Sequence, residues 1–317
     1  MTSSVVLLPN WIGDLLLALS IVEKLPEVRR SRTTLLVPKG MGVLASQLCD
    51  LPQIPYDRAD AGERSLTLSR VRTGGFRSIY LLPYSFSSAW FALRSGIPHR
   101  RGLSREMRGF LLTDPLSGSL RDKTRHITRE YSEILDTSFS PPEAWTGRSI
   151  EADRSCEGAF VYCPGAAYGP AKRWPYFPDL AKLHQRQGII VLGTAADSAS
   201  AKEIAAAAPG RVTDLTGRTS LTEAARIMAG AHAVISNDSG LMHLAGYLGV
   251  PVVGVFGSTS AVWTRPLGER CVVMQSAESC SPCFERTCRY GHYRCLAAIS
   301  AEAVARAAEY ITLSAGR

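Results

Sequence analysis

Short apolar runs alternate with helical patterns along the first half of the chain. The run at 5–8 predicts a buried strand, and beyond the loop at 9–13 an apolar helical pattern extends from 14 to 24. Further strands are expected at 34–38 and 78–82, with helical patterns between them. This alternation favours a parallel sheet covered by helices on both faces.

The second half repeats the alternation more clearly. Residues 220–223, Ser-Leu-Thr-Glu, form a capping-box motif, in which hydroxyl and carboxylate bond to free N–H groups at a helix start. A last helical pattern at 301–311 could pack back on the N-terminal domain. We expect strands at 159–163, 189–193, 233–236 and 251–256, and helices at 177–186, 197–208, 221–229 and 239–248.

Turn residues with little periodicity separate the two halves at 136–153. The chain has 317 residues, about twice the usual length of one domain. We therefore expect an α/β protein with two domains, 1–150 and 151–317, that face a central cleft.

Composition excludes several protein classes. The chain is 45% hydrophobic and 20% charged, which is a globular balance rather than a disordered one. Its longest apolar runs, such as 250–256, fall far short of the ~20 residues that cross a bilayer. The N-terminus lacks a basic segment, and Pro9, Asn10 and Asp14 interrupt its apolar run, so we expect no signal peptide and a cytoplasmic protein.

Basic residues are concentrated in one segment of a chain whose formal net charge is +8. A solvated face would explain this segment, and so would an anionic partner, either a nucleic acid, an acidic membrane surface or a phosphorylated substrate. Between 94 and 129 the basic residues are Arg94, Arg100, Arg101, Arg105, Arg108, Arg121, Lys123, Arg125 and Arg129, and the acidic ones Glu106, Asp114 and Asp122.

Two loops that follow predicted strands of the second half could bind an anion. In the loop at 237–240, Asp238 can cap the next helix, while Ser239 and Gly240 leave its first N–H groups open to a diphosphate. His243 lies one helical turn further and can reach the same anion. An ordinary helix cap with a partly exposed histidine is the alternative.

The second loop, 164–175, contains small residues that let a ligand approach the backbone. Lys172 and Arg173 bring two cations to one place, as in a diphosphate clamp. A surface loop with ordinary basic residues is the alternative. Near the N-terminus, Asp14 follows Gly13 at a helix start, where it is either a general base or a charge favoured by the helix dipole.

Four cysteines lie within sixteen residues near the C-terminus: Cys280, Cys283, Cys288 and Cys295. This density suggests a structural Zn or Fe–S site, although no standard spacing for either is matched. Free thiols or a redox-labile disulfide are the alternatives.

These segments together resemble the ADP-heptose:lipopolysaccharide heptosyltransferases, and most closely the heptosyltransferase II branch, in which many sequences carry a similar Cys-rich segment. The likeness runs in order from about residue 4 to 300. The segments that carry it are 9–14, 96–100, 105–108, 169–175, 237–243 and 256–260.

The resemblance implies a GT-B architecture of two Rossmann-like α/β domains, with the acceptor on the N-terminal domain and ADP-heptose on the C-terminal one. It implies Asp14 as the catalytic base and Lys172 as the catalytic cation that contacts the diphosphate. Asp197 is the weaker match to an acidic residue that holds the ribose. The other implied donor contacts are Arg173, Asp238, Ser239, Gly240 and His243, and the acceptor contacts are Asn10, Trp11, Arg100, Arg101 and Arg105.

The implied reaction is inverting transfer of heptose from ADP-L-glycero-D-manno-heptose to the heptose/Kdo inner core of lipopolysaccharide, with no cofactor required. The acceptor would be a lipid A-core glycolipid at the cytoplasmic face of the inner membrane, which implies peripheral membrane contact. A related glycosyltransferase with a protein or other glycan acceptor stays open. A nucleic-acid-binding protein with a Cys-rich metal knuckle is disfavoured, because the basic segment lacks interleaved aromatic residues, and we expect no nucleic-acid partner.

Overall fold

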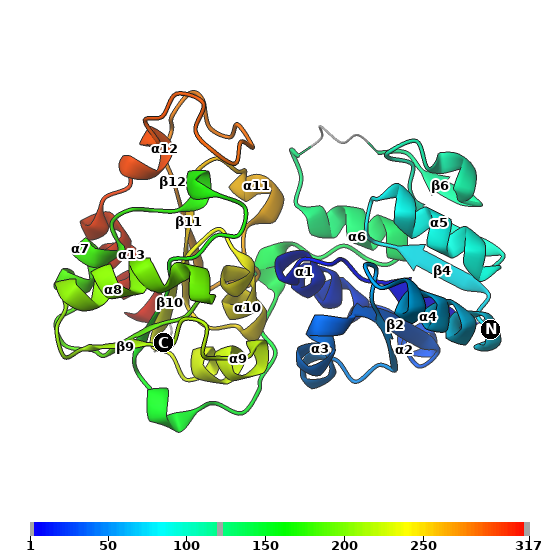
Figure 1. Cartoon of the computed structure of the whole chain (residues 1–317), viewed down its shortest axis with the longest axis horizontal. Helices are drawn as coiled ribbons and strands as arrows, with labels where there is room; N and C mark the ends of the chain where they lie inside the picture. The colour runs from blue at the N-terminus through cyan, green and yellow to red at the C-terminus, as the bar shows by residue number, and fades with distance from the viewer. Residues whose placement is uncertain (1–2, 119–122, 314–317) are drawn as a thin grey trace. The chain divides into compact units, whose positions relative to one another are not determined.

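A computed structural model describes residues 3–118 and 123–313 of the chain. The chain divides into two compact units, Met1–Ser140 and Pro141–Arg317, each built on its own parallel sheet (Figure 1). We call them the N-terminal unit and the C-terminal unit.

The sheet of the N-terminal unit has six strands in the order β3-β2-β1-β4-β5-β6. Helices α1 and α6 pack against each other, and α4 packs on α5 (Figure 1). The strands are β1 (Ser4–Leu7), β2 (Thr33–Pro38), β3 (Gln53–Tyr56), β4 (Ser78–Leu81), β5 (His99–Leu103) and β6 (Asp114–Leu116). The helices are α1 (Ile12–Val22), α2 (Glu27–Arg30), α3 (Gly42–Leu48), α4 (Ala61–Thr73), α5 (Phe86–Ser95) and α6 (Ile127–Leu135).

The sheet of the C-terminal unit also has six strands, in the order β12-β11-β10-β7-β8-β9. Its strands are β7 (Phe160–Cys163), β8 (Ile189–Val191), β9 (Val212–Asp214), β10 (Ala233–Asn237), β11 (Val252–Phe256) and β12 (Cys271–Gln275). The helices are α7 (Phe177–Leu183), α8 (Ser198–Ala207), α9 (Leu221–Ala229), α10 (Gly240–Leu248), α11 (Ala261–Thr264), α12 (Arg294–Ala297) and α13 (Ala301–Leu313).

The apolar runs of the sequence form the cores. Strands β7 and β10 are buried along their whole lengths, as expected for central parallel strands with helices on both faces. Helix α1 is buried from Leu15 to Val22 because its sequence is apolar on all sides. Helix α13 packs on α7, β10, β11 and β12 of its own unit, and the prediction that it also packs on the N-terminal domain is not tested.

The prediction of an α/β protein with parallel sheets is confirmed, and the predicted elements lie within a few residues of the observed ones. Strands β3, β5, β6, β9 and β12 were not predicted from the sequence. Among the described residues, no helix combines the length and the apolar character that crossing a bilayer requires.

The capping box predicted at 220–223 is present. Ser220 Oγ accepts from the Glu223 N–H at 3.2 Å, and the Glu223 carboxylate accepts from the Ser220 N–H at 2.7 Å. Replacing Ser220 by Ala should therefore lower the free energy of unfolding by about 1 kcal/mol. Thermal or urea unfolding would measure this. Ser46→Ala is the matched control, since the Ser46 hydroxyl is exposed and caps no helix, and an equal loss in both variants would contradict the prediction.

Candidate active site

The C-terminal unit has a topological switch point between β7 and β10. From β7 the chain continues outward to β8 and β9, whereas β10 is followed on its other side by β11 and β12. The loops after such a pair of strands diverge and leave a crevice at the carboxyl edge of the sheet, where open α/β sheets bind ligands. Here these loops are 164–176 and 238–239, and they lie in the segments 164–175 and 237–240 that were predicted to bind an anion.

The side chain of Asn237 joins these two loops. Its amide nitrogen donates to the Pro164 carbonyl at 2.6 Å, and its amide oxygen accepts from the Trp174 N–H at 3.1 Å. Asn237 is fully buried at the end of β10, so both bonds form away from water. The ends of the loop 164–175 are thus fixed to the strand that leads into the second loop.

An ion pair lies at the centre of this region. Lys172 Nζ is 2.5 Å from Asp238 Oδ2, and the two side chains are 13% and 4% exposed. Thr259 Oγ1, from the loop after β11, donates to the same carboxylate oxygen at 2.5 Å. The ammonium also lies 4.8 Å from the centre of the Tyr168 ring. The fold thus places the Lys172 ammonium, largely removed from water, beside the switch point.

The prediction that Asp238 caps α10 is wrong. Ser239 is the N-cap residue, and it makes no side-chain cap bond to the helix. Its hydroxyl instead lies 3.2 Å from the Ser236 hydroxyl. Asp238 bonds to Lys172 and Thr259, since a buried ammonium offers its carboxylate a stronger partner than a backbone N–H does.

His243 is buried one turn into α10. Burial is the main cause that lowers its pKa to about 4; the charge of Asp238 opposes this shift and that of Lys172 adds to it, and the imidazole is neutral near pH 7. Its Nδ1 is buried and has no hydrogen-bond partner among the described residues. The alternative of a partly exposed histidine is therefore wrong, and this nitrogen can accept or donate one bond to a ligand.

The carboxylate of Asp197 accepts hydrogen bonds within the loop that carries it. Its Oδ2 accepts from the Thr194 N–H at 2.9 Å and from the Thr194 hydroxyl at 2.8 Å, while Arg173 lies 3.3 Å from Oδ1. A Cβ on Gly165 would lie 2.4 Å from this carboxylate, so the close approach requires glycine there. These contacts give Asp197 and Arg173 a structural role, and their contact with a donor stays a prediction.

The sheet of the N-terminal unit also has a topological switch point, which lies between β1 and β4. Asp14 lies in the first turn of α1, which follows β1, and Tyr84 lies in the loop after β4. Burial raises the pKa of Tyr84 well above its usual value, and the nearby carboxylates of Glu130 and Asp14 raise it further. Asp14 has the same effect on the buried Tyr131. The candidate base therefore stands next to two tyrosines that stay protonated.

A second ion pair lies beside these tyrosines. Arg105 donates to Glu130 Oε1 at 2.6 Å, and their side chains are 5% and 13% exposed. Tyr84 donates to the other oxygen of Glu130 at 2.5 Å, and the Arg105 guanidinium lies over the Tyr84 ring. Tyr84 and Glu130 were not among the predicted site residues, because a lone tyrosine or glutamate carries no local motif.

The predicted acceptor residues differ in exposure. Asn10 and Trp11 are exposed at the start of α1, where a ligand can reach them. Arg100 donates to the carbonyls of Leu111 and Ile97, and Arg101 pairs with Asp114 at 2.5 Å. With Arg105 paired to Glu130, all three arginines have structural partners, and their role in acceptor binding stays a prediction.

The remaining basic segment is not one solvated face. Arg108 is fully buried, donates to Pro83 and Ser88, and has its pKa lowered to about 10 by burial. Arg129 lies over the Phe139 ring at 4.4 Å. Arg121, which belongs to the predicted cluster, lies outside the described residues.

The four clustered cysteines are free thiols that line one cavity of about 270 Å³ together with Ala171 and Ser258. Backbone N–H groups, that of Tyr293 first, lower the pKa of the Cys288 thiol. Within 3–118 and 123–313, no three His, Cys, Asp or Glu side chains are arranged to ligate one metal ion. The described residues therefore give no support to the predicted Zn or Fe–S site at Cys280, Cys283, Cys288 and Cys295, which stays a prediction.

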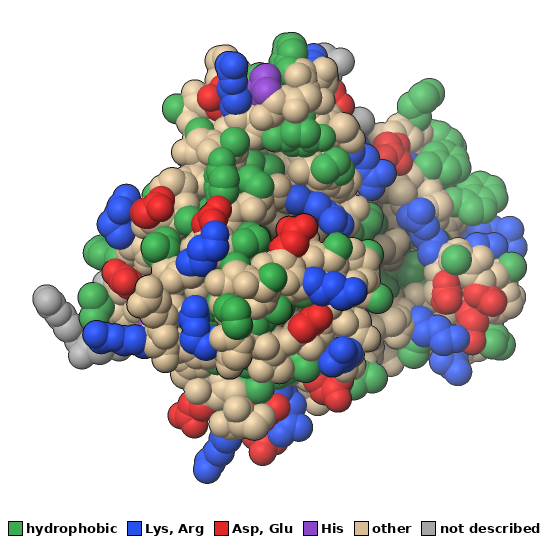
Figure 2. Space-filling model, turned by 60° about the vertical axis from the view of Figure 1, so that its left-hand side comes forward, with side chains coloured by type: hydrophobic (Ala, Val, Ile, Leu, Met, Phe, Trp, Pro, Cys, Tyr) green, Lys and Arg blue, Asp and Glu red, His purple; other side chains and the backbone are tan. Residues whose placement is uncertain are grey.

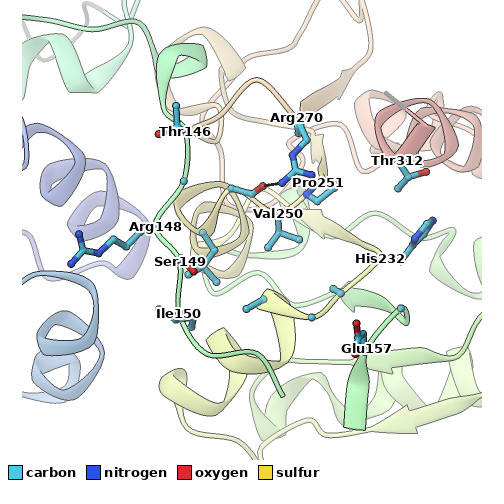
Figure 3. A pocket seen from close by; sticks show the side chains of 17 residues that line it. Thr146, Arg148, Ser149, Ile150, Glu157, His232, Val250, Pro251, Arg270 and Thr312 are labelled. Atoms are coloured by element: carbon cyan, nitrogen blue, oxygen red, sulfur yellow. Dashed lines mark hydrogen bonds between the residues drawn. The ribbon is translucent and has the colours of Figure 1, made fainter. Parts of the chain in front are cut away.

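A larger cavity, of about 590 Å³, opens at the opposite edge of this sheet, beside the residues that precede β7, β10 and β11 (Figure 3). Arg270 donates to the Gly249 carbonyl there, and Arg148 points away from both Arg270 and His232 (Figure 3). The cations of this cavity do not converge on a common point. We therefore do not place the chemistry in this cavity, although it is the larger of the two.

The buried histidines predict how stability depends on pH. His243 and His184 each have a pKa near 4 when folded, and an unfolded histidine has one near 6.5. The unfolded chain therefore takes up protons first, and stability is lost as the pH falls from about 6.5 to 4. His243→Gln should reduce the loss between pH 7 and 4.5 by about 2 kcal/mol, as followed by urea unfolding. His292→Gln, at an exposed position, should lose as much as the wild type.

Comparisons with known proteins agree with this architecture. The family model "Glycosyltransferase family 9 (heptosyltransferase)" matches residues 67–294. Lipopolysaccharide heptosyltransferase 2 of Escherichia coli is 30% identical over 84% of this chain and 86% of its own length. The structure of E. coli ADP-heptose lps heptosyltransferase II superposes with a TM-score of 0.81 and 26% identity, covering 99% of this chain and 100% of that one.

The fold is shared more widely. E. coli heptosyltransferase WaaC, solved with ADP, superposes with a TM-score of 0.74 at 18% identity, covering 98% of this chain and 99% of that one. The predicted GT-B architecture of two Rossmann-like domains is confirmed by these matches. The chain belongs to glycosyltransferase family 9, the heptosyltransferase family.

Proposed function

We propose that this protein is an inverting glycosyltransferase that moves heptose from ADP-L-glycero-D-manno-heptose to the heptose/Kdo inner core of lipopolysaccharide. Its family supports the reaction class, and the names of its relatives support the sugar and the acceptor. The structural observation that carries the proposal is the Lys172–Asp238 pair at the switch point of the C-terminal sheet. The nucleic-acid alternative is not favoured, because none of these relatives is named for one.

The donor side of the reaction is assigned to the C-terminal unit. Negative charge builds on the ADP as its bond to the sugar breaks. Lys172 is held in place by Asp238, and the first N–H groups of α10 are not capped by a side chain, so both can stabilise that charge. The neutral imidazole of His243 supplies one more polar contact beside them.

The acceptor side is assigned to the N-terminal unit. Asp14 takes the proton of the acceptor hydroxyl as that oxygen attacks the anomeric carbon from the face opposite ADP. Tyr84 and Tyr131 stay protonated beside it, so neither competes as a base. The exposed Asn10 and Trp11, at the start of the same helix, would contact the acceptor. No cofactor enters these steps.

The acceptor is assigned as a lipid A-core glycolipid. Such a molecule is anchored in the inner membrane, so the protein would work at the cytoplasmic face in peripheral contact with the bilayer. The exposed arginines of the N-terminal unit, such as Arg58, Arg72 and Arg94, support this assignment, since acidic headgroups attract arginine and lysine near the surface.

Transfer itself is tested by incubating purified protein with ADP-heptose and a core-truncated lipopolysaccharide. Mass spectrometry should find the acceptor heavier by one heptose residue.

Asp14→Asn should lower kcat by ~10²-fold or more while donor affinity is nearly kept, because it removes the base without touching the diphosphate site. A kcat within about threefold of the wild-type value would remove Asp14 from this role.

Lys172→Ala should weaken ADP binding by about 10- to 100-fold, as expected for one charge-assisted contact to a phosphate. Calorimetric titration with ADP measures this. The change also leaves Asp238 buried without its cation, so the double variant Lys172→Ala/Asp238→Asn is needed to restore folding without restoring affinity. Lys182→Ala removes an exposed lysine of the same unit and serves as the control. Equal ADP affinity in wild type and both Lys172 variants would refute the clamp.

A further inference from the structure

Five large apolar side chains are exposed together on the N-terminal unit. Phe86, Trp90 and Leu93 lie at i, i+4 and i+7 of α5 and so form a stripe along one face of that helix. Met107 and Phe110, in and after the loop that follows β5, are 90% and 76% exposed. We call these five residues the apolar patch.

The patch is continuous and held in place. The Phe110 ring lies 6.3 Å from the Phe86 ring, and Glu106 accepts a hydrogen bond from the Phe86 N–H at 3.2 Å. Glu106 and Met107 both have positive φ, a conformation that non-glycine residues adopt only at an energetic cost. The turn at 106–107 thus presents the Met107 side chain to solvent.

Basic residues border the patch. Arg94 lies on α5 and is exposed, and Arg72 of α4 donates two bonds to the Arg94 carbonyl at 3.0 and 2.6 Å. Arg58 donates to the Ser85 hydroxyl next to the start of α5. The carboxylate of Glu106 is bonded to the α5 N-terminus, which offsets its charge. At the right of Figure 2, hydrophobic side chains lie next to basic ones, with acidic side chains among them.

This combination fits one kind of partner. Apolar side chains that stand beside arginines bind the interface of a bilayer, where the apolar groups enter the acyl boundary and the cations meet acidic headgroups. A soluble monomer seldom exposes so many large apolar residues together without a partner. We propose that the apolar patch is the surface with which this protein docks on an anionic bilayer.

Docking through the patch would serve the reaction because of where the patch lies relative to Asp14. This step of the inference rests on the proposed function. Helix α5 begins after β4 and the Met107 loop follows β5, so Phe86 at the start of α5 and the Met107 loop lie at the carboxyl edge of the parallel sheet. Helix α1, which carries Asp14, begins at the same edge after β1. A bilayer on the patch would therefore present a lipid-anchored acceptor to the edge of the unit that holds the candidate base.

Vesicle co-sedimentation tests the proposal with the full chain. Wild type should sediment with phosphatidylglycerol/phosphatidylethanolamine vesicles and much less with phosphatidylcholine vesicles. Trp90→Gln/Phe110→Gln should reduce the bound fraction about fivefold or more, and Arg94→Gln should weaken binding to the anionic vesicles only. Val28→Ser and Val43→Ser remove exposed apolar residues of the same unit outside the patch and should bind like wild type.

Equal binding by wild type and the Trp90/Phe110 variant, with unchanged thermal unfolding, would overturn the proposal. So would self-association of wild type in sedimentation velocity that the variant loses, without vesicle binding, because the patch would then be covered by a second copy. In transfer assays the variant should keep its rate on a delipidated core oligosaccharide and lose it on a vesicle-embedded acceptor. If wild type transfers to neither acceptor, the proposed function fails, and vesicle binding still decides the role of the patch.

Discussion

The contact on which the candidate donor site depends is the ion pair between Lys172 and Asp238. Both groups are almost removed from water, and taking two charges out of water costs several kcal/mol per ion unless each finds good partners. Thr259 supplies a further hydrogen bond to the carboxylate, and Tyr168 lies against the ammonium. A hydrophobic pair would fill the same space at less cost. The charges make physical sense if the ammonium serves a ligand at the switch point, since it is already desolvated and positioned there.

The same logic applies in the N-terminal unit, where Arg105 and Glu130 form a buried pair beside Tyr84. Each unit thus holds a largely buried ion pair near the carboxyl edge of its sheet. The surroundings differ in a way that suits the two assigned tasks. On the assigned donor side, the Lys172–Asp238 pair lies beside the start of α10, whose first N–H groups no side chain caps. On the assigned acceptor side, the Arg105–Glu130 pair lies beside Tyr84, whose pKa is raised by the charge of Asp14 among other causes.

The sequence predicted those parts of the fold that depend on apolar periodicity. Central strands such as β7 and β10 are buried throughout and were found, but β5 was not, because three of its five residues are His99, Arg100 and Arg101. Its arginines bond to backbone carbonyls and to Asp114, and such long-range partners leave no trace in a local pattern. Arg105 and Arg108 were assigned to the basic segment for the same reason. A run of charged residues shows only the local composition, whereas the burial of each residue depends on partners that are distant in the sequence.

The candidate site followed a similar rule. Lys172, Ser239 and His243 could be proposed from the sequence because each lies in a loop or helix start after a recognisable strand. The role of Asp238 was misassigned, because its choice between a helix N–H and Lys172 depends on a loop more than sixty residues away in the sequence. Asn237 and Thr259 were quoted within motifs, but their bonds to the other loops could be learned only from the structure.

The Cys-rich segment packs against the loop of the candidate donor site. Its backbone reaches the loop that carries Lys172: the Ala171 N–H donates to the Arg286 carbonyl at 3.1 Å, and the Tyr168 hydroxyl donates to the Phe284 carbonyl. A Cβ on Gly169 would lie 2.5 Å from the Arg286 carbonyl oxygen, so the two chains pass too closely for any other residue there. The segment thus supports the loop that carries Lys172, and the position of the Lys172 ammonium depends on these contacts.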